Sequence, residues 1–273
     1  MDHQMKKRFG QNFLRDPNLL AKIVRMADVS GKNVIEVGPG MGTLTQALCQ
    51  VASKVRAYEI DKTLKRYLEE LKGTHANLEI VWTDFLDVDL ENLEETWDVV
   101  ANVPYYITTP ILFKILEAER VGSATLMVQK EVASRLLSDP GQKTYNALSV
   151  ILQNRADVMK VMDVSRKMFH PVPNVDSSVV RIVKHEDHDP KGRALFETFV
   201  KHAFTQKRKT LVNNLHEGYG VPKSEITDFL VTNDLDPLVR AERLSVPTFR
   251  TLSSEWPWHD HRKTPPEGSP LSL

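Results

Sequence analysis

Residues that could bind and modify a nucleotide-like ligand occur at four places in the sequence, each at or just after the end of a predicted strand. A glycine-rich turn covers residues 38–42, acids follow at Glu59 and Asp84, and the fourth segment is Asn102-Val103-Pro104-Tyr105-Tyr106. Glycines let a ligand lie against the backbone, and carboxylates accept hydrogen bonds from hydroxyl or amino groups. An amide, a proline and two aromatic rings suit a flat, uncharged ligand that forms hydrogen bonds.

The spacing of the glycines indicates the class of ligand. Residues 38–42 form G-x-G-x-G with Pro39 inside the turn, whereas the nicotinamide dinucleotide fingerprint is G-x-G-x-x-G. The early third glycine therefore predicts an adenosyl ligand without a pyrophosphate. Glu59, which ends the next apolar run, is placed to bind both hydroxyls of a ribose.

Asp84 and the Asn102 segment each allow two interpretations. Asp84 could accept a hydrogen bond from the amino group of an adenine, or it could cap a helix. The segment after residues 97–101 could be an ordinary Asn-x-Pro turn, or it could be a site that accepts protons. Proline removes a backbone donor, so this loop offers carbonyls and few donors.

The apolar runs alternate with amphipathic segments, and this pattern predicts right-handed βαβ units in a mostly parallel, Rossmann-like sheet. The carboxyl ends of parallel strands meet at one edge of a sheet, so the four segments should face one another. A proline-rich loop joins the last two strands, and we expect them to form an antiparallel edge hairpin. The predicted strands cover residues 33–37, 55–60, 78–82, 97–101, 124–128, 158–162 and 179–183.

A smaller helical region is expected after a charged linker at residues 185–191. The predicted helices there cover residues 194–215, 224–231 and 247–256. The expected domains are an arm and helix at 1–26, the sheet domain at 27–185, a small all-α domain at 191–256 and a disordered tail at 257–273.

The composition excludes several classes of protein. The 273 residues have formal net charge zero from 36 basic and 36 acidic residues, and Cys49 is the only cysteine. An intrachain disulfide and a cysteine-based zinc site are therefore impossible, and we expect no metal. No run approaches the roughly 18 apolar residues of a membrane span, and the amino terminus leads into no apolar segment of a signal peptide. We expect a cytoplasmic protein without membrane contact.

Five further motifs, together with the acids at the strand ends, resemble the KsgA family of small-subunit rRNA adenine dimethyltransferases. They are RFGQNFL (8–14), EVGPG (36–40), QKEVA (129–133), FHPVPNVDS (169–177) and AFTQKRKTL (203–211). The resemblance covers about residues 6 to 250. The sequence departs from the family pattern at Ala101, Val103 and Tyr106. None of these positions has a role in the methyl transfer described below.

The resemblance implies a class I methyltransferase domain that uses S-adenosyl-L-methionine. It implies transfer of two methyl groups to N6 of each of two adjacent adenines in the hairpin near the 3′ end of 16S rRNA, in an immature 30S particle. A monomer is expected. The cofactor contacts that it implies are Asn12, Leu14, Gly38, Gly40, Glu59, Asp84 and Asn102.

The expected chemistry needs no general base before attack. The side-chain oxygen of Asn102 and the carbonyl of Pro104 would accept the two hydrogens of N6 and direct its lone pair at the methyl group. Tyr105 and Phe169 would stack on the flipped base. Phosphate contacts are expected from the basic residues Lys6, Lys7, Arg8, Arg166, Lys167, Lys207, Arg208 and Lys209.

Three other functions compete with this one. An Erm-like enzyme would methylate a large-subunit rRNA adenine, but residues 169–177 and 206–209 favour the KsgA family. A non-catalytic ribosome-assembly factor would keep the fold without turnover, and the intact site residues argue against it. The glycine spacing counts against a nicotinamide oxidoreductase.

Overall fold

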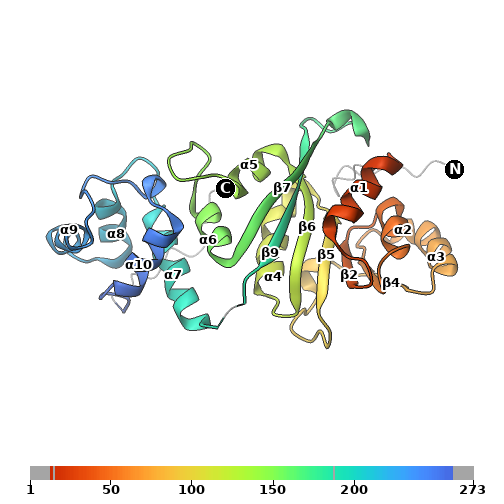
Figure 1. The fold of residues 1–273 in the computed structure, drawn as a ribbon, viewed down its shortest axis with the longest axis horizontal. Coiled ribbons are helices and arrows are strands. Elements are labelled where there is room, and N and C mark those ends of the chain that lie inside the picture. Colours follow the sequence, from red (N-terminus) through yellow and green to blue (C-terminus); the bar gives the residue numbers. More distant parts are fainter. Residues whose placement is uncertain (1–12, 15, 187, 261–273) are drawn as a thin grey trace. The chain divides into compact units, whose positions relative to one another are not determined.

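The computed structural model describes residues 13–14, 16–186 and 188–260, and its chain divides into two compact units (Figure 1). The first unit comprises Met1–Ala133 and Asp157–Lys184, and the second comprises Ser134–Ala156 and His185–Leu273. Among the described residues, no helix is long and apolar enough to cross a membrane.

The first unit is built on a seven-stranded sheet with the order β4-β3-β2-β5-β6-β9-β7. The strands from β4 to β6 pair in parallel, and β9 pairs with β6 in the antiparallel sense. The expected mostly parallel, Rossmann-like sheet with an antiparallel edge is confirmed. Its strands are β2 (Asn33–Val37), β3 (Lys54–Tyr58), β4 (Leu78–Val81), β5 (Trp97–Asn102), β6 (Val121–Gln129), β7 (Ala156–Val164) and β9 (Ser177–Lys184).

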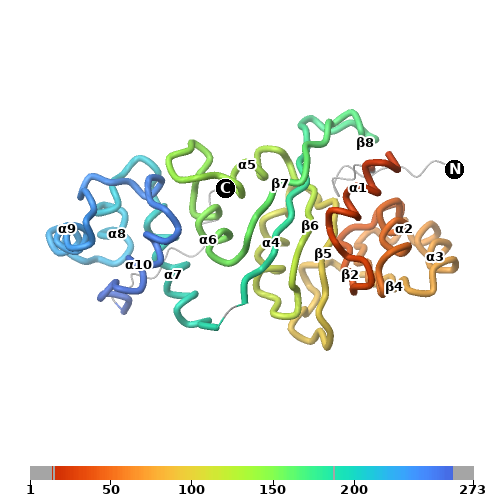
Figure 2. Tube along the Cα trace, in the orientation of Figure 1, coloured from red at the N-terminus to blue at the C-terminus, as the bar shows by residue number. Residues whose placement is uncertain are grey.

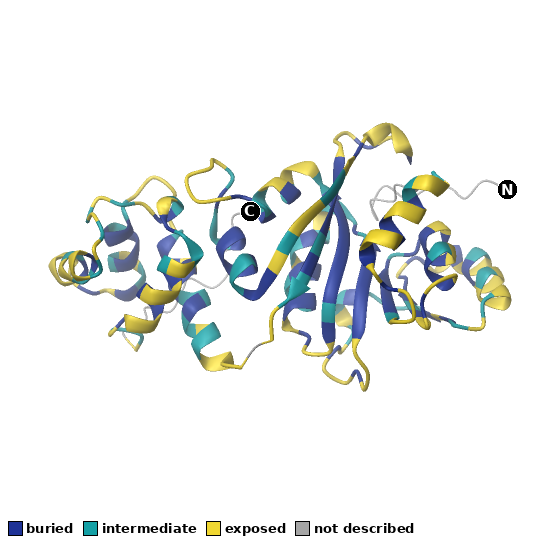
Figure 3. Cartoon of the chain, viewed as in Figure 1, coloured by how far each residue is buried: buried dark blue, intermediate teal, exposed yellow. Residues whose placement is uncertain are grey.

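The central strands are buried because their sequences are almost continuously apolar, as parallel strands covered on both faces require. Figure 3 shows β5 and β6 buried along most of their length, and Val99, Leu126 and Val128 are fully inaccessible. The helices that follow the strands are α2 (Thr43–Cys49), α3 (Lys65–Thr74), α4 (Thr108–Glu117) and α5 (Lys130–Leu136).

The N-terminal helix α1 (Pro17–Ala27) begins at a capped proline. The Asp16 carboxylate accepts a hydrogen bond from the Leu19 amide at 3.0 Å, and Pro17 is the first helical residue. Before it, β1 (Phe13–Leu14) pairs in the antiparallel sense with β8 (Phe169–His170), so that Leu14 lies opposite Phe169. This short ribbon joins the N-terminal segment to the proline-rich loop, which the tube in Figure 2 traces near the β8 label.

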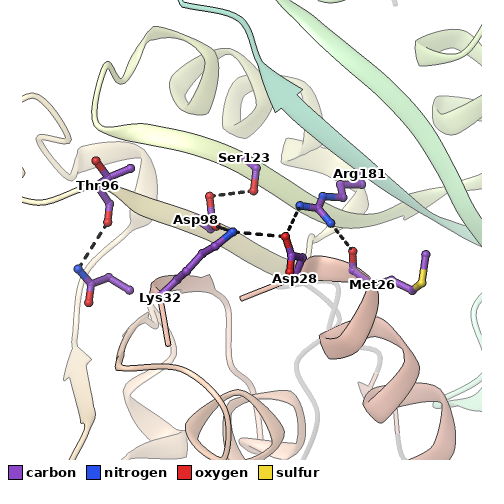
Figure 4. A network of polar contacts seen from close by, with 8 residues as sticks. Met26, Asp28, Lys32, Thr96, Asp98, Ser123 and Arg181 are labelled. Carbon is purple, nitrogen blue, oxygen red and sulfur yellow. Dashed lines mark hydrogen bonds and ion pairs between the residues drawn. The ribbon is translucent and has the colours of Figure 1, made fainter. Parts of the chain in front are cut away.

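A polar network fixes the edge of the sheet where β5 and β6 begin (Figure 4). The Asp28 carboxylate pairs with Arg181 at 3.3 Å, and Lys32 pairs with Asp98 at 3.3 Å. Asp98 is buried and also accepts a hydrogen bond from the Ser123 hydroxyl at 2.8 Å. The network therefore holds the C-terminal end of α1 to the sheet. It lies at the end where the parallel strands begin, away from their carboxyl ends.

The second unit is helical. Its core is aromatic: the ring of Phe199 lies 5.3 Å from that of Trp256 and 6.4 Å from those of Tyr219 and Phe249. Its helices are α6 (Ala147–Arg155), α7 (Pro190–Ala203), α8 (Leu211–Tyr219), α9 (Lys223–Thr232) and α10 (Val246–Glu255).

The single helix predicted over residues 194–215 is wrong, because the chain breaks between α7 and α8. The Asn214 amide donates to the carbonyls of Ala203 and Gln206, at 2.6 and 3.2 Å, and so holds the intervening turn. Thr210 then caps α8 by accepting from the Asn213 amide.

Residues 134–156 group with the second unit, whereas the domain limits expected from the sequence placed them with the sheet. The Tyr145 hydroxyl donates to the Leu244 carbonyl at 2.9 Å, and the Arg155 guanidinium pairs with Glu197 at 3.2 Å. These bonds join α6 and its preceding turn to the C-terminal helices.

Candidate active site

A cavity opens at the carboxyl ends of β2, β3, β4 and β5, where the sequence places its four chemistry-bearing segments. The structure brings the predicted residues Leu14, Gly38, Gly40, Glu59, Asp84, Asn102, Pro104 and Tyr105 into its lining. Glu36, Thr43, Ile60, Phe85 and Tyr106 also line it. The common edge arises from the parallel register of the strands, as expected for open α/β sheets.

The glycine-rich turn leaves room for a ligand next to the backbone. Gly38 has φ +69° and Gly40 has φ +60°, which are conformations that favour glycine. A Cβ atom added to Gly38 would have no neighbour within 4 Å among the described residues, so the space beside its Cα is open. Gly42, at φ +82°, instead packs closely, because an added Cβ would lie 2.7 Å from the Leu71 side chain.

Glu59 is held rigidly at the next strand end. Its side chain is buried, its Oε2 accepts from the Gly40 amide at 3.1 Å and its Oε1 accepts from the Asp61 amide at 2.8 Å. Burial raises the pKa of this carboxyl, and the backbone hydrogen bonds oppose that rise. Each carboxylate oxygen has a second acceptor position, so two hydroxyl groups can still be bound.

Asp84 serves as a helix cap and as part of the cavity wall. One carboxylate oxygen, Oδ1, accepts from the Leu86 amide at 2.9 Å and begins a short 3₁₀ helix, η3 (Phe85–Asp87). The side chain also lines the cavity. The cap interpretation is confirmed, and the contact with an adenine amino group stays a prediction for the second carboxylate oxygen.

Asn102 is the last residue of β5, half-buried, and the loop after it turns into a 3₁₀ helix, η4 (Tyr105–Ile107). The Pro104 carbonyl accepts from the Ile107 amide at 3.1 Å and, more weakly, from the Thr108 hydroxyl at 3.4 Å. The Tyr105 hydroxyl lies 2.7 Å from the Ser177 hydroxyl. The segment is thus an ordered wall of the cavity.

Tyr106 is 61% exposed and forms part of the cavity rim. Partial burial raises the pKa of its hydroxyl, and the carboxylates of Asp84 and Glu59 add to the rise.

Phe169 is not brought to the cavity. It is 3% exposed and belongs to the hydrophobic core with Leu14, Leu20 and Met127. Its stacking role stays a prediction and would require β8 to move. Asn12, Lys6, Lys7 and Arg8 lie outside the described residues.

Glu36 is a cavity residue that the sequence reasoning missed. Its side chain is 1% exposed, and its Oε2 atom has no hydrogen-bond partner in the described part of the chain. Burial, with a smaller contribution from the charge of Glu59, raises the pKa of Glu36 to about 8. The signal was present as an acid among the apolar residues Val34, Ile35 and Val37.

The predicted RNA-binding residues that the structure describes lie on exposed turns. Arg166 and Lys167 belong to a 3₁₀ helix, η5 (Arg166–Met168), in the first unit. Residues 207–209 are exposed in the turn between α7 and α8 of the second unit, where the Lys207 ammonium donates to the Lys143 carbonyl at 3.3 Å.

Comparison with known sequences gives consistent matches over nearly the whole chain. A family model described as Ribosomal RNA adenine dimethylase matches residues 2–254. A protein of Aster yellows witches'-broom phytoplasma (strain AYWB), named Ribosomal RNA small subunit methyltransferase A, is 44% identical over 263 residues, covering 94% of this chain and 97% of the relative. A protein of the same name from Bacillus mycoides (strain KBAB4) is 44% identical over 265 residues, covering 91% and 90%.

Solved structures agree with these matches. A dimethyladenosine transferase from Plasmodium falciparum superposes with a TM-score of 0.77 at 28% identity, covering 88% of this chain and 95% of that chain. The 23S rRNA methyltransferase ErmE superposes with a TM-score of 0.74 at 30% identity, covering 89% and 98%. The extent of the family match and the identity to its full-length relatives show that this chain belongs to the ribosomal RNA adenine dimethylase family.

Proposed function

We propose that this protein transfers methyl groups from S-adenosyl-L-methionine to N6 of two adjacent adenines in the 3′-terminal hairpin of 16S rRNA, giving N6,N6-dimethyladenine. One observation carries the proposal. The glycine turn, the buried Glu59 and the Asn102 loop meet in one cavity, in a chain 44% identical to proteins named Ribosomal RNA small subunit methyltransferase A.

The residues of the cavity fit a cationic adenosyl ligand. The open space beside Gly38 leaves room for the ligand to lie against the backbone. Glu59 can accept hydrogen bonds from the ribose hydroxyls of the ligand. The buried Glu36 carboxyl keeps an acceptor atom without a partner among the described residues, as suits a ligand that brings donors or positive charge. When bound, S-adenosyl-L-methionine supplies an electrophilic methyl group on a sulfonium. Leu14, Asp84 and Asn102 complete the proposed contacts, and Asn12 is expected to join them from outside the described residues.

The protein's part in the reaction is to localise and aim the lone pair of adenine N6, which is otherwise delocalised into the ring. Asn102 Oδ1 and the Pro104 carbonyl would each accept one N6 hydrogen. The nitrogen then moves toward tetrahedral geometry with its lone pair facing the methyl group. Positioning of this kind can lower a barrier by roughly 7–11 kcal/mol in favourable cases.

The Pro104 carbonyl has limited capacity for this role. It already accepts from the Ile107 amide at 3.1 Å, and a carbonyl oxygen has two lone pairs. The contact with the Thr108 hydroxyl at 3.4 Å is weak enough to give way. Pro104 therefore offers one acceptor position, which is what a single N6 hydrogen needs.

The target base must leave its stack, at a cost of a few kcal/mol. Tyr105 lines the cavity and can offset part of this cost, since stacking on an aromatic side chain contributes about 1–3 kcal/mol per base. Phe169 would add to this only after leaving the core.

RNA affinity is expected to depend on exposed cations that contact phosphates. Arg166 and Lys167 serve in the first unit and residues 207–209 in the second, with Lys6, Lys7 and Arg8 as further candidates. We propose an immature 30S particle as the substrate, coupling to small-subunit maturation, a monomeric enzyme and a cytoplasmic location.

The choice of RNA separates this function from its nearest alternative. The similarity to ErmE makes a large-subunit adenine the second candidate. Immature small subunits and large-subunit RNA would each be incubated with labelled S-adenosyl-L-methionine. Label on N6 of small-subunit adenines supports the proposal, label on large-subunit RNA supports the alternative, and no label on either would leave a non-catalytic assembly factor.

The role of Asn102 has a direct test. We expect Asn102→Ala to lower turnover by about 100-fold, the size of effect that small misplacements at a reacting centre produce. Cofactor binding should stay measurable by calorimetry, because the glycine turn and Glu59 remain. Asn92→Ala, at an exposed site, is the matched control. Unchanged turnover in Asn102→Ala would refute the acceptor role.

A further inference from the structure

Tyr105 is the one predicted stacking ring that the structure places in the cavity lining. Phe169, the other, is buried in the core. A stacking ring helps catalysis only if it is held in one orientation, because its position fixes the plane of the base. What holds Tyr105 therefore bears on how the base is presented.

The Tyr105 hydroxyl is held by a residue 72 positions away in the sequence. Its oxygen lies 2.7 Å from the hydroxyl oxygen of Ser177, a distance typical of a good O–H···O hydrogen bond. Ser177 is the first residue of β9 and is fully inaccessible to solvent. Its backbone lies opposite Gln129 in the β6–β9 ladder, so its position is fixed by the sheet.

The residue before Ser177 is also fixed. The Asp176 carbonyl accepts from the Lys130 amide at 3.0 Å, and the Asp176 carboxylate accepts from the Arg166 amide at 2.9 Å. A hydroxyl in such a setting has little freedom to follow a moving partner. The pair therefore connects a rigid strand end to a ring on the cavity wall.

We propose that Ser177 is a positioning residue that fixes the Tyr105 ring against which the target adenine stacks, and that this matters most in the second methylation. The inference rests on the proposed function. In the first methylation the amine has two N–H groups for Asn102 and Pro104. The monomethylated amine has one, so its orientation depends more on the stacked ring.

The test uses full-length variants on immature small subunits, with monomethyl and dimethyl adenine measured separately by mass spectrometry. Ser177→Ala and Tyr105→Phe each remove the hydrogen bond, and Tyr105→Phe keeps the ring. We expect kcat for the second methyl transfer to fall about fivefold in each, as loss of one hydrogen bond allows. Monomethyladenine should accumulate, and the KM for S-adenosyl-L-methionine should stay unchanged.

A purely structural role makes different predictions. Ser178→Ala is the matched control, because Ser178 is as deeply buried and its hydroxyl donates to Asp163 at 2.6 Å, away from Tyr105. It should lower the melting temperature comparably and leave the product ratio unchanged. The Ser177→Ala/Tyr105→Phe double variant should be no slower than either single variant. Additive losses, or a wild-type product ratio in Ser177→Ala, would overturn the inference.

A readout without turnover keeps the inference separate from the proposed function. With 3-fluorotyrosine at position 105, the ¹⁹F NMR resonance of the ring should be single and narrow in the parent and in Ser178→Ala. In Ser177→Ala it should broaden or split, and an unchanged resonance would also overturn the inference. Methylation of small subunits by the wild-type protein tests the proposed function. The proposed function and the role of Ser177 can therefore fail independently.

Discussion

The buried carboxyl of Glu36 should make the stability of the ligand-free protein depend on pH. Burial is the main cause that raises its pKa from 4.5 to about 8, so at neutral pH the folded protein carries it protonated. In the unfolded chain the same group is ionised above pH 4.5. Between these values the folded state holds the extra proton, and stability therefore falls as pH rises. The stabilisation is fully present below pH 4.5 and is lost as pH rises through about 8.

The size of the effect follows from the two pKa values. Since one pKa unit corresponds to about 1.4 kcal/mol, this group alone should cost about 3 kcal/mol of unfolding free energy between pH 5.5 and pH 8. Glu36→Gln replaces the acid with a group of similar shape that does not titrate. The variant should lack this contribution, and its stability should decline less over the same interval.

Urea denaturation at pH 5.5 and pH 8, followed by circular dichroism, measures the difference. Glu70→Gln, at an exposed position on α3, is the control and should follow the parent protein. The reasoning is refuted if Glu36→Gln and the parent lose equal stability between the two pH values. The reasoning is also refuted if the parent protein gains stability relative to Glu36→Gln as the pH rises.

Three further predictions concern the second unit. A Cβ atom on residue 218 would overlap the His202 ring. Gly218→Ala should therefore lower the melting temperature measured by calorimetry by several degrees. An unchanged melting temperature would contradict the close approach of α7 and α8. Glu197→Ala removes the 3.2 Å ion pair with the buried Arg155 guanidinium and should lower the unfolding free energy in urea titrations by about 2 kcal/mol, more than Glu217→Ala at the surface. Charge reversal at residues 207–209 should weaken RNA binding and flatten its salt dependence; an unchanged slope would show that this turn contacts no phosphate.

The sheet and the glycine turn could be predicted because their signals are local. Residues 33–37 and 97–101 are mostly apolar runs bounded by turn residues, and the positive φ angles of Gly38 and Gly40 follow from the need for a tight turn. The convergence of Glu59, Asp84 and Asn102 then follows from the topology of a parallel sheet alone.

Other features depend on contacts between distant residues, which local patterns do not carry. The break between α7 and α8 is held by the Asn214 side chain, which donates to the Ala203 and Gln206 carbonyls on the other side of the turn. Phe169 lies in β8, which pairs with β1. Its partner in that pairing is Leu14, 155 residues earlier in the sequence, and local patterns do not show this contact. Tyr105 and Ser177 likewise meet only through the folded sheet.

The identity of the modified base tests the account most directly. Small-subunit RNA from particles treated with this protein and S-adenosyl-L-methionine would be digested to nucleosides and analysed by mass spectrometry, with Asn102→Ala in parallel. The account predicts N6,N6-dimethyladenosine at two adjacent positions of the 3′-terminal hairpin with the parent protein, and about 100-fold slower formation with the variant. Unmodified adenosine with the parent protein, or methylation confined to large-subunit RNA, would contradict it.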